Sequence, residues 1–387
     1  MYGKLVRLLC TLVALTMVGV FITGCENGNG NGNGDDNGNG DDIVIGVLTP
    51  TTGAHAYFGN DMVQSFTLAI EQINAAGGVL GRNLRLFIAD DASSPETATL
   101  AAQRIITENV DFVAGGYASS AVLPTLSLFY EADLLMLIAN ANSTMITEAG
   151  YSQSFMINSP GHHAARTLAG LLDYLNVERV ALIHQGCAFS QNLATLCQEI
   201  LPNYGFEIST TQVMEQGAPD VSAIVTAIRE ANTDFVYWCG YYADGSNVIK
   251  QLRQGGFTGG IGVGDGSASI NLIEAAGPEG EGIFITSPPF VEFTPGGEEF
   301  AAAYRERFGN DPGTFSTLSF DTIKLLAYAI EQAGTTDTEA VRDVVQNIEF
   351  LGLSGLISFT ADRELANSNF LILRIQDGAF EIVELPS

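Results

Sequence analysis

Basic residues are scarce in this chain of 387 residues. Lysine occurs only at positions 4, 250 and 324, and lysine and arginine together number 16 against 44 acidic residues, so the formal net charge is −28. A surface of this charge opposes nucleic acids, which proteins hold through lysine and arginine contacts to phosphate. It also opposes electrostatic binding to anionic lipid. The simplest meaning of the charge is general solubility, and we expect no nucleic-acid partner.

Long apolar runs are also rare, because only residues 8–22 form one and no other run approaches 18 residues. This run follows a short basic start and has the length of a signal-peptide core, which is too short for a stable membrane span. The segment Ile22-Thr23-Gly24-Cys25 resembles the bacterial lipobox, in which cleavage precedes a cysteine that then carries lipid. We therefore expect residues 1–24 to be a lipoprotein signal peptide and Cys25 to be the lipid attachment site. An uncleaved anchor with an incidental cysteine is the alternative.

Residues 26–42 contain only Asn, Gly, Asp and one Glu. No apolar side chain offsets the entropy of ordering this segment, so residues 25–42 are expected to be a lipidated, disordered tether. As a flexible coil it would span about 20–25 Å. Loss of the two basic residues of the signal peptide would change the net charge from −28 to −30. The remaining chain, from residue 43, is longer than one hydrophobic core usually holds, which predicts two domains.

Cysteines number five, without a CxxC or a Cys/His cluster, so no metal site is expected. Export would leave Cys187, Cys197 and Cys239, two of which an oxidising compartment can join. Cys187 and Cys239 follow strands that should be adjacent, and we expect these two to pair. Cys197 lies two to three turns into a helix and is the poorer partner for Cys187.

Apolar runs alternate with helical periodicity along the rest of the chain, which predicts two doubly wound α/β units with parallel sheets. A closing β-hairpin is expected to turn at Asp377-Gly378. The two units echo each other, since Asp-Phe-Val runs at 111–113 and 234–236 each lead to a Gly-Tyr pair, ending at Tyr117 and Tyr241. Such strand ends are where open α/β sheets bind ligands. The strands are expected at 43–50, 84–91, 111–117, 134–141, 180–184, 207–214, 234–240, 261–265 and 283–287, and the helices include 61–78 and one opened by Ser94-Pro95.

The order of these motifs resembles the type I periplasmic binding proteins of the branched-chain amino acid (Leu/Ile/Val) family, the solute receptors of ABC importers. Segments 43–61, 69–98, 112–124, 234–242 and 352–360 carry the resemblance, above all Ile-Asn-Ala-Ala-Gly-Gly-Val-Leu-Gly-Arg at 73–82. It implies two doubly wound lobes joined by a three-strand hinge that close on a small ligand. Lobe 1 would comprise residues 43–158 and 290–352, and lobe 2 residues 159–289 and 353–387. The crossings would fall near 158–161, 287–290 and 350–355.

The resemblance also implies a binding site for an amino acid. Its carboxylate would meet Ser119, with Ser120 adjacent, at the start of a helix, where unpaired N–H groups attract anions; the alternative is that both hydroxyls merely cap the helix. A second clamp would come from Asn140 and Asn142. Asn142 stands where the family usually has Thr, so we expect a difference in the shape of the ligand or in the geometry at its carboxylate, with Ser143 as a substitute hydroxyl.

The ammonium group of the ligand would pair with Asp265, which follows a strand; the alternative is a turn residue in an Asp-Gly pair. Aromatic side chains would complete the pocket, with core packing as the alternative for any one of them. Two of them stand where the family has Tyr, which would make the walls more apolar. The expected aromatic contacts are Tyr57, Phe58, Phe189 and Tyr241, with Phe315 as a further candidate.

These features together predict a lipid-anchored, extracytoplasmic receptor of an ABC importer that binds a branched-chain or other hydrophobic amino acid. We expect it to be a monomer that delivers the amino acid to the transmembrane permease subunits, without a cofactor. An oxidoreductase would need a GxGxxG loop, and residues 262–266 match it only in part. No Ser-His-Asp order or nucleophile elbow is evident either. Two alternatives remain open: a receptor for a small amide, a urea-like compound or an aromatic acid, and a sensing module that acts through a membrane partner.

Overall fold

A first sheet occupies the N-terminal half of the computed structural model, which describes residues 42–385. Within that range its five strands are all parallel, in the order β2-β1-β3-β4-β5. Ile43, Ile45 and Val47 of β1 lie in one core cluster and Leu48 lies in another, so both faces of the sheet are covered. This double burial explains the near-continuous apolar runs. The strands are β1 (Ile43–Thr49), β2 (Leu84–Asp90), β3 (Phe112–Gly115), β4 (Met136–Ile138) and β5 (Ser154–Met156).

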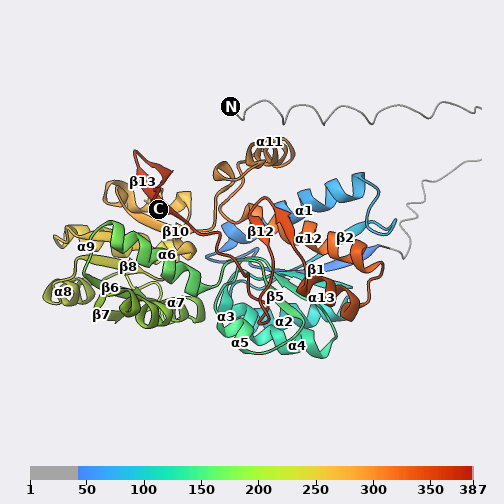
Figure 1. Ribbon diagram of the computed structural model, residues 1–387, viewed down its shortest axis with the longest axis horizontal. Helices are drawn as coiled ribbons and strands as arrows, with labels where there is room; N and C mark the ends of the chain where they lie inside the picture. Colours follow the sequence, from blue (N-terminus) through green and yellow to red (C-terminus); the bar gives the residue numbers. More distant parts are fainter. Residues whose placement is uncertain (1–41, 386–387) are drawn as a thin grey trace, which may run out of the picture. The chain divides into compact units, whose positions relative to one another are not determined.

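Helices cover the two faces of the first sheet (Figure 1). α1 and α12 pack together on one face, and α2, α3 and α4 lie on the other. α1 begins at Ala56, earlier than the expected residue 61. α2 begins where expected, because the Ser94 hydroxyl accepts a hydrogen bond from the Thr97 N–H at 3.4 Å and Pro95 occupies the first turn. These helices are α1 (Ala56–Ala75), α2 (Pro95–Thr107), α3 (Ser119–Val122), α4 (Leu126–Glu131) and α12 (Ser316–Ala333), with the short α5 (Met145–Glu148), η1 (Leu123–Thr125), α11 (Gly297–Phe308) and α13 (Thr338–Gln346) nearby.

A second sheet has the order β14-β13-β10-β9-β8-β6-β7 within residues 42–385. Its first five strands in the sequence are parallel, and β13 and β14 add an antiparallel hairpin at one edge. The hairpin turns at Asp377 and Gly378, both with positive φ, which confirms the expected turn. The strands are β6 (Arg179–His184), β7 (Glu207–Val213), β8 (Phe235–Trp238), β9 (Gly260–Val263), β10 (Phe284–Ser287), β13 (Leu371–Gln376) and β14 (Ala379–Ile382).

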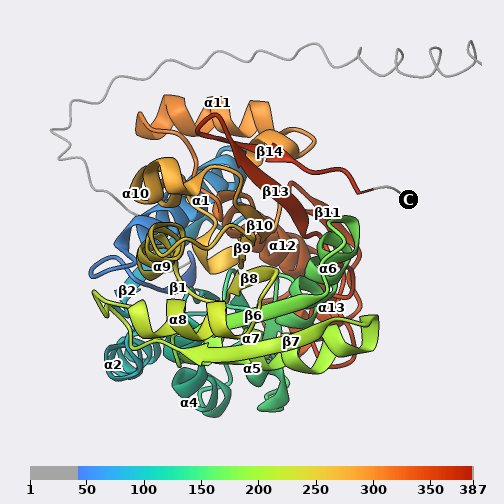
Figure 2. The same cartoon turned by 90° about the vertical axis from the view of Figure 1, so that its left-hand side faces the viewer.

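Strand alternation divides the side chains of β8 between the two faces of the second sheet. Phe235 and Tyr237 pack with α6 and α7, whereas Val236 and Trp238 pack with α8, α9 and α10. In the view of Figure 2, β6, β7 and the helix α8 lie on the side of this sheet that is nearest the viewer. The helices are α6 (Gly161–Tyr174), α7 (Ala188–Ile200), α8 (Ser222–Glu230), α9 (Tyr242–Gln254) and α10 (Ile270–Ala276), with the 3-10 turns η2 (Leu201–Tyr204), η3 (Asp265–Ser267), η4 (Gly277–Gly280) and η5 (Val291–Phe293).

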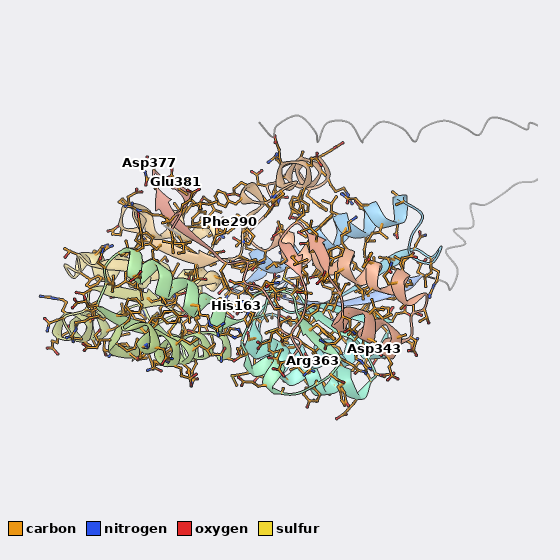
Figure 3. All side chains as sticks on the ribbon, in the orientation of Figure 1. His163, Phe290, Asp343, Arg363, Asp377 and Glu381 are labelled. Atoms are coloured by element: carbon orange, nitrogen blue, oxygen red, sulfur yellow. The ribbon has the colours of Figure 1, made fainter. Side chains whose placement is uncertain are left out.

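The chain passes between the two sheets three times: after β5, after β10, and before β13. The last passage falls later than the expected 350–355, because the loop after the hairpin of β11 (Phe350–Gly352) and β12 (Gly355–Ile357) still packs on β5. There the Met156 N–H donates to the Arg363 carbonyl at 3.0 Å. Figure 3 shows Arg363 beside the helices of the first sheet, and Asp377 and Glu381 on the distant hairpin.

Two of the three passages are joined by a side-chain hydrogen bond. The Ser159 hydroxyl, just after β5, donates to Asn369 Oδ1 at 2.7 Å, just before β13. Within residues 42–385, no helix combines the length and the hydropathy that crossing a membrane requires. The predicted signal peptide, lipid site and tether lie outside the described residues.

Candidate ligand-binding cavity

A small cavity lies where residues following strands of both sheets converge. This is the carboxyl-end location at which open parallel sheets bind ligands. Its contributors come from the ends of β3, β4, β8 and β9 and from the starts of α7 and α12. The lining residues are Tyr117, Asn140, Asn142, Phe189, Tyr241, Asp265, Gly266 and Phe315.

Aromatic rings form the apolar walls of the cavity. The Tyr241 ring lies 5.9 Å from that of Tyr117 and 5.3 Å from that of Phe189, and the Phe315 ring lies 5.9 Å from that of Tyr117. Such separations are typical of aromatic pairs in protein cores. Rings from both sheets therefore meet around one small volume, which suits an apolar group of a ligand.

The backbone at the end of β3 places Tyr117 in this wall. Gly115 and Gly116 both have positive φ, and a Cβ on Gly115 would lie 2.3 Å from the Leu48 carbonyl oxygen. Only glycine tolerates this combination of conformation and close backbone approach. The turn that follows β3 therefore brings Tyr117 over the ends of the strands.

Asp265 is the acidic centre of the cavity and is only 3% exposed. Its Oδ2 accepts hydrogen bonds from Asn142 Nδ2 at 2.9 Å and from Asn158 Nδ2 at 3.3 Å. Burial raises the pKa of Asp265 to about 7, although the two amide hydrogen bonds act in the opposite direction. A cation beside this carboxyl group would restore its ionised form near neutral pH.

Several buried polar atoms around the cavity have no hydrogen-bond partner among residues 42–385. They are Asp265 Oδ1, Asn140 Oδ1, the Ser143 hydroxyl and the Tyr117 hydroxyl. The first two are acceptors when Asp265 is ionised, and the two hydroxyl groups can donate. Buried polar groups in folded proteins are normally satisfied, so these atoms are available to bind the polar groups of a ligand. The acceptors suit an ammonium group and the hydroxyl donors suit a carboxylate.

No cation lines the cavity in the part of the chain that the structure describes. The nearby imidazole of His55 lies 4.4 Å from the Tyr241 ring, and burial lowers the pKa of His55 to about 4, so this ring is neutral at physiological pH. A ligand carboxylate would therefore be held by neutral donors only.

Hydrogen bonds between loops of the two sheets enclose the cavity. Asn142 follows β4 of the first sheet and Asp265 follows β9 of the second, so their hydrogen bond spans the gap. On one side, Thr144 N–H donates to Asn192 Oδ1 at 3.1 Å and Asn192 Nδ2 donates to Thr144 Oγ1 at 3.0 Å. On another, the Thr314 hydroxyl donates to the Ala268 carbonyl. The structure thus has the two sheets closed over the cavity.

The structure brings five of the nine expected ligand-contact residues into the cavity lining: Asn140, Asn142, Phe189, Tyr241 and Asp265. Phe58 is fully buried behind the lining, where its ring stacks on Tyr117 at 4.9 Å. Tyr57, in contrast, is 42% exposed, packs edge-on against Phe58 and does not line the cavity. Adjacent residues of a helix point about 100° apart, so only one of this pair can face inward.

Ser119 and Ser120 begin α3, which is only four residues long. The Ser119 hydroxyl is buried and accepts a hydrogen bond from the Ser143 N–H at 3.4 Å, which links it to the rim of the cavity. Ser120 is half-buried. Neither residue is part of the cavity lining in the closed arrangement.

Sequence reasoning left Tyr117, Gly266, His55 and Asn158 out of the expected contacts. For Tyr117 a signal was present, because the Gly-Tyr pair that marks Tyr241 also occurs there. Asn158 carries no such signal, since its amide reaches Asp265 only through the passage after β5. Among the described residues, no group of His, Cys, Asp and Glu side chains could hold a metal ion.

The cysteines differ from the expected pairing. The structure joins none of Cys187, Cys197 and Cys239 to another, and the cysteine that interacts with the Cys239 thiol is Cys197. Cys187 directly precedes α7 and is half-buried, whereas the other two are fully buried. As expected, Cys187 and Cys239 follow two adjacent strands, β6 and β8 respectively. However, the turn at Gly186 places Cys187 at the start of α7.

Comparison with known proteins agrees with this architecture. A family model described as periplasmic binding protein matches residues 42–379. A leucine-, isoleucine-, valine-, threonine- and alanine-binding protein of Pseudomonas aeruginosa is 26% identical over 336 residues, which cover 86% of this chain and 89% of that protein. A solved leucine-binding protein from Thermotoga maritima has a TM-score of 0.82 and 25% identity, with 88% of this chain and 98% of that one covered.

A solute-binding protein of an ABC transporter from R. palustris, solved with benzoate, has the same fold at 16% identity, with a TM-score of 0.80 over 89% of this chain and 96% of that one. The expected fold, a pair of doubly wound α/β units of the type I periplasmic binding proteins, is therefore confirmed. The chain belongs to the periplasmic binding protein family, whose members are substrate-binding proteins of transporters and not enzymes.

Proposed function

We propose that this chain is the extracytoplasmic substrate-binding protein of an ABC importer and that its ligand is a hydrophobic α-amino acid of the branched-chain type. The observation that carries the proposal is the set of unpartnered atoms in the cavity. Asp265 Oδ1 and Asn140 Oδ1 suit an ammonium group, and the Ser143 and Tyr117 hydroxyls suit a carboxylate. The relatives named for binding leucine, isoleucine and valine support the same choice.

The aromatic walls select the side chain of the ligand in this proposal. Phe189, Tyr241 and Phe315 leave an apolar space next to the polar atoms. An aliphatic side chain would be buried there, at about 0.8 kcal/mol for each buried CH₂ group. A polar side chain would lose its hydration without gaining a partner.

The two sheets with their helices act as two lobes in this proposal. One comprises residues 43–158 and the chain from 290 to the passage before β13, and the other comprises residues 159–289 with β13 and β14. The three passages between the sheets are the hinge, and the Ser159–Asn369 hydrogen bond couples two of them. Ligand exchange then requires the breaking of the hydrogen bonds that Asn192 and Asp265 make across the cleft.

Binding is tested by differential scanning fluorimetry with matched ligands. Leucine is compared with 4-methylpentanoate, which keeps the carboxylate and the branched side chain but lacks the ammonium group. At 100 times its Kd, a ligand should raise the free energy of unfolding by about 2.7 kcal/mol. A response to leucine and none to 4-methylpentanoate is expected. The reverse order would refute the amino-acid assignment.

A receptor for a small amide or an aromatic acid is the second candidate. The Asn142 side chain lines the cavity, although its amide N–H groups donate to Asp265 Oδ2 and the Ser159 carbonyl, and a protein of the same fold was solved with benzoate. Asp265 disfavours an anion that lacks an ammonium group, because a buried carboxylate would lie close to a second negative charge. Benzoate and 3-methylbutanamide in the same fluorimetry screen decide between the candidates.

Lipid attachment at Cys25 and a monomeric state complete the proposal. The lipobox at 22–25 and the polar segment that follows support an anchored receptor on a flexible tether. Metabolic labelling with a fatty acid should mark the wild-type chain and leave a Cys25→Ser variant unlabelled. Light scattering during size-exclusion chromatography should give the mass of one chain, and a dimer mass would contradict the monomer.

A further inference from the structure

Cys197 and Cys239 are both buried in the core between α7 and the second sheet. Every second residue of a strand points to the same face of its sheet, so residues 235, 237 and 239 share the face that α6 and α7 cover. Cys239 therefore lies on that face together with Tyr237. On α7 and the turn that follows it, Leu193, Cys197 and Leu201 share one side at a spacing of four residues, and this side is buried in the same cluster. Both side chains are therefore buried between α7 and the second sheet, and burial together with the neighbouring Cys197 raises the pKa of the Cys239 thiol.

We propose that Cys197 and Cys239 are joined by a disulfide bond when the exported chain folds, and that Cys187 remains a free thiol. The bond would connect α7 directly to the segment that follows β8. Disulfides form in the extracytoplasmic compartments where periplasmic binding proteins act. This inference goes beyond the binding function and does not depend on the identity of the ligand.

The oxidant is a disulfide, either a small one such as oxidised glutathione or that of a dithiol oxidase. The thiolate of one cysteine attacks a sulfur atom of the oxidant, forms a mixed disulfide and releases one thiolate. The second cysteine then attacks the protein sulfur in the mixed disulfide and releases the other. Two electrons pass from the cysteine pair to the oxidant, and the two protons of the cysteines are taken up by the released thiolates.

Oxidation has to precede the final packing of α7. Both side chains are inaccessible in the folded chain, and burial raises the pKa of the Cys239 thiol, so that the reactive thiolate is scarce there. During folding, in contrast, both thiols are open to an oxidant. Cys187 is half-buried at the start of the helix, and neither of the other two thiols is among the groups that shift its pKa.

The bond would act on the wall of the ligand cavity. Phe189 lies in the first turn of α7, and Tyr241 follows Cys239 by two residues. Their rings lie 5.3 Å apart and both line the cavity. A covalent link between these two segments would hold the second-sheet side of the cavity as one unit while the cleft opens and closes.

Peptide mapping of the full chain tests the proposal. The chain is reduced, denatured and refolded in oxidised glutathione, free thiols are alkylated in denaturant, and the product is digested with chymotrypsin. Cleavage after Phe189 or Leu193 separates Cys187 from Cys197, which trypsin would leave on one peptide. The expected result is a Cys197–Cys239 cross-linked peptide and an alkylated Cys187. Alkylated Cys197 and Cys239, or any cross-link through Cys187, would overturn the proposal.

Matched variants add a second measurement that does not depend on mapping. Cys187→Ser should form the bond, and its oxidised form should melt several degrees higher than its reduced form. Cys187→Ser combined with Cys197→Ser should melt at one temperature under both conditions. Equal melting of the oxidised and reduced forms of Cys187→Ser would count against the bond.

Discussion

Replacing Asp265 with asparagine should weaken amino-acid binding and at the same time stabilise the empty protein. Asparagine has the shape of the carboxyl group, but it cannot carry the charge that pairs with an ammonium group. Removing one partner of a buried, charge-assisted pair costs about 2–4 kcal/mol. The Kd for leucine should therefore rise about 30- to 1000-fold, measured by isothermal titration calorimetry.

The gain in stability follows from the pKa of Asp265. Burial raises that pKa from 3.8 to about 7, so the folded state holds its proton more tightly than the unfolded state does. The favourable contribution of Asp265 is fully present below pH 3.8 and is lost as the pH rises through 7. The full cost of ionisation is then roughly 4 kcal/mol, at 1.36 kcal/mol for each pKa unit. Asp265→Asn escapes this cost and should unfold at higher denaturant concentration than the wild type at pH 8.

Asp91→Asn is the matched control. Asp91 is also fully buried with a pKa raised to about 7, and it does not line the cavity. Its amide variant should show a similar gain in stability at pH 8 with an unchanged Kd for leucine. If Asp265→Asn binds leucine with wild-type affinity, or loses both affinity and stability, the role given to Asp265 is wrong.

Three further outcomes are expected. Because leucine binds the ionised form of Asp265, its Kd should rise about tenfold for each pH unit below about 6 in the wild type, but stay level in Asp265→Asn, by calorimetry at pH 5, 6 and 8. Asn192→Ala removes two hydrogen bonds across the cleft and should speed leucine dissociation about 5- to 30-fold in stopped-flow measurements, whereas Gln198→Ala on the same helix should not. Trp238, the sole tryptophan, donates to the Tyr241 carbonyl at 3.1 Å, so its fluorescence should change on leucine binding; a constant spectrum at saturation would contradict the placement of the ligand.

The fold was predictable because its signals are local. Buried parallel strands read as apolar runs, the Ser94-Pro95 pair marks a helix start, and Asp377-Gly378 marks a hairpin turn. The family resemblance placed Asn140 and Asp265 at strand ends, the repeated Gly-Tyr pair did the same for Tyr241, and all three lie in the cavity lining. A strand end fixes the place of the next residue within a few ångströms.

The predictions that differ from the structure concern which side of a helix faces inward and which residues far apart in the sequence lie in contact. Whether Tyr57 or Phe58 faces inward depends on where α1 begins, and its start at Ala56 was not apparent from the sequence. Cys197 was passed over because the pairing was judged from strand ends, whereas Cys197 lies inside α7 on its buried side. The last passage between the sheets falls late because of the Met156–Arg363 hydrogen bond, a contact between residues far apart in the sequence. Tertiary packing decides such details, and a periodic pattern does not contain them.

The pairing of β10 with β13 has a consequence for biosynthesis. Phe284 pairs with Arg374, so an interior strand of the second sheet waits for a partner that leaves the ribosome 90 residues later. Until then the outer side of β10 is an open edge with unpaired N–H and C=O groups, which is a template for aggregation. Chains that stop before Leu371 should therefore accumulate as aggregates rather than as partly active receptors, and contacts so distant in sequence make completion of this sheet a late step in folding.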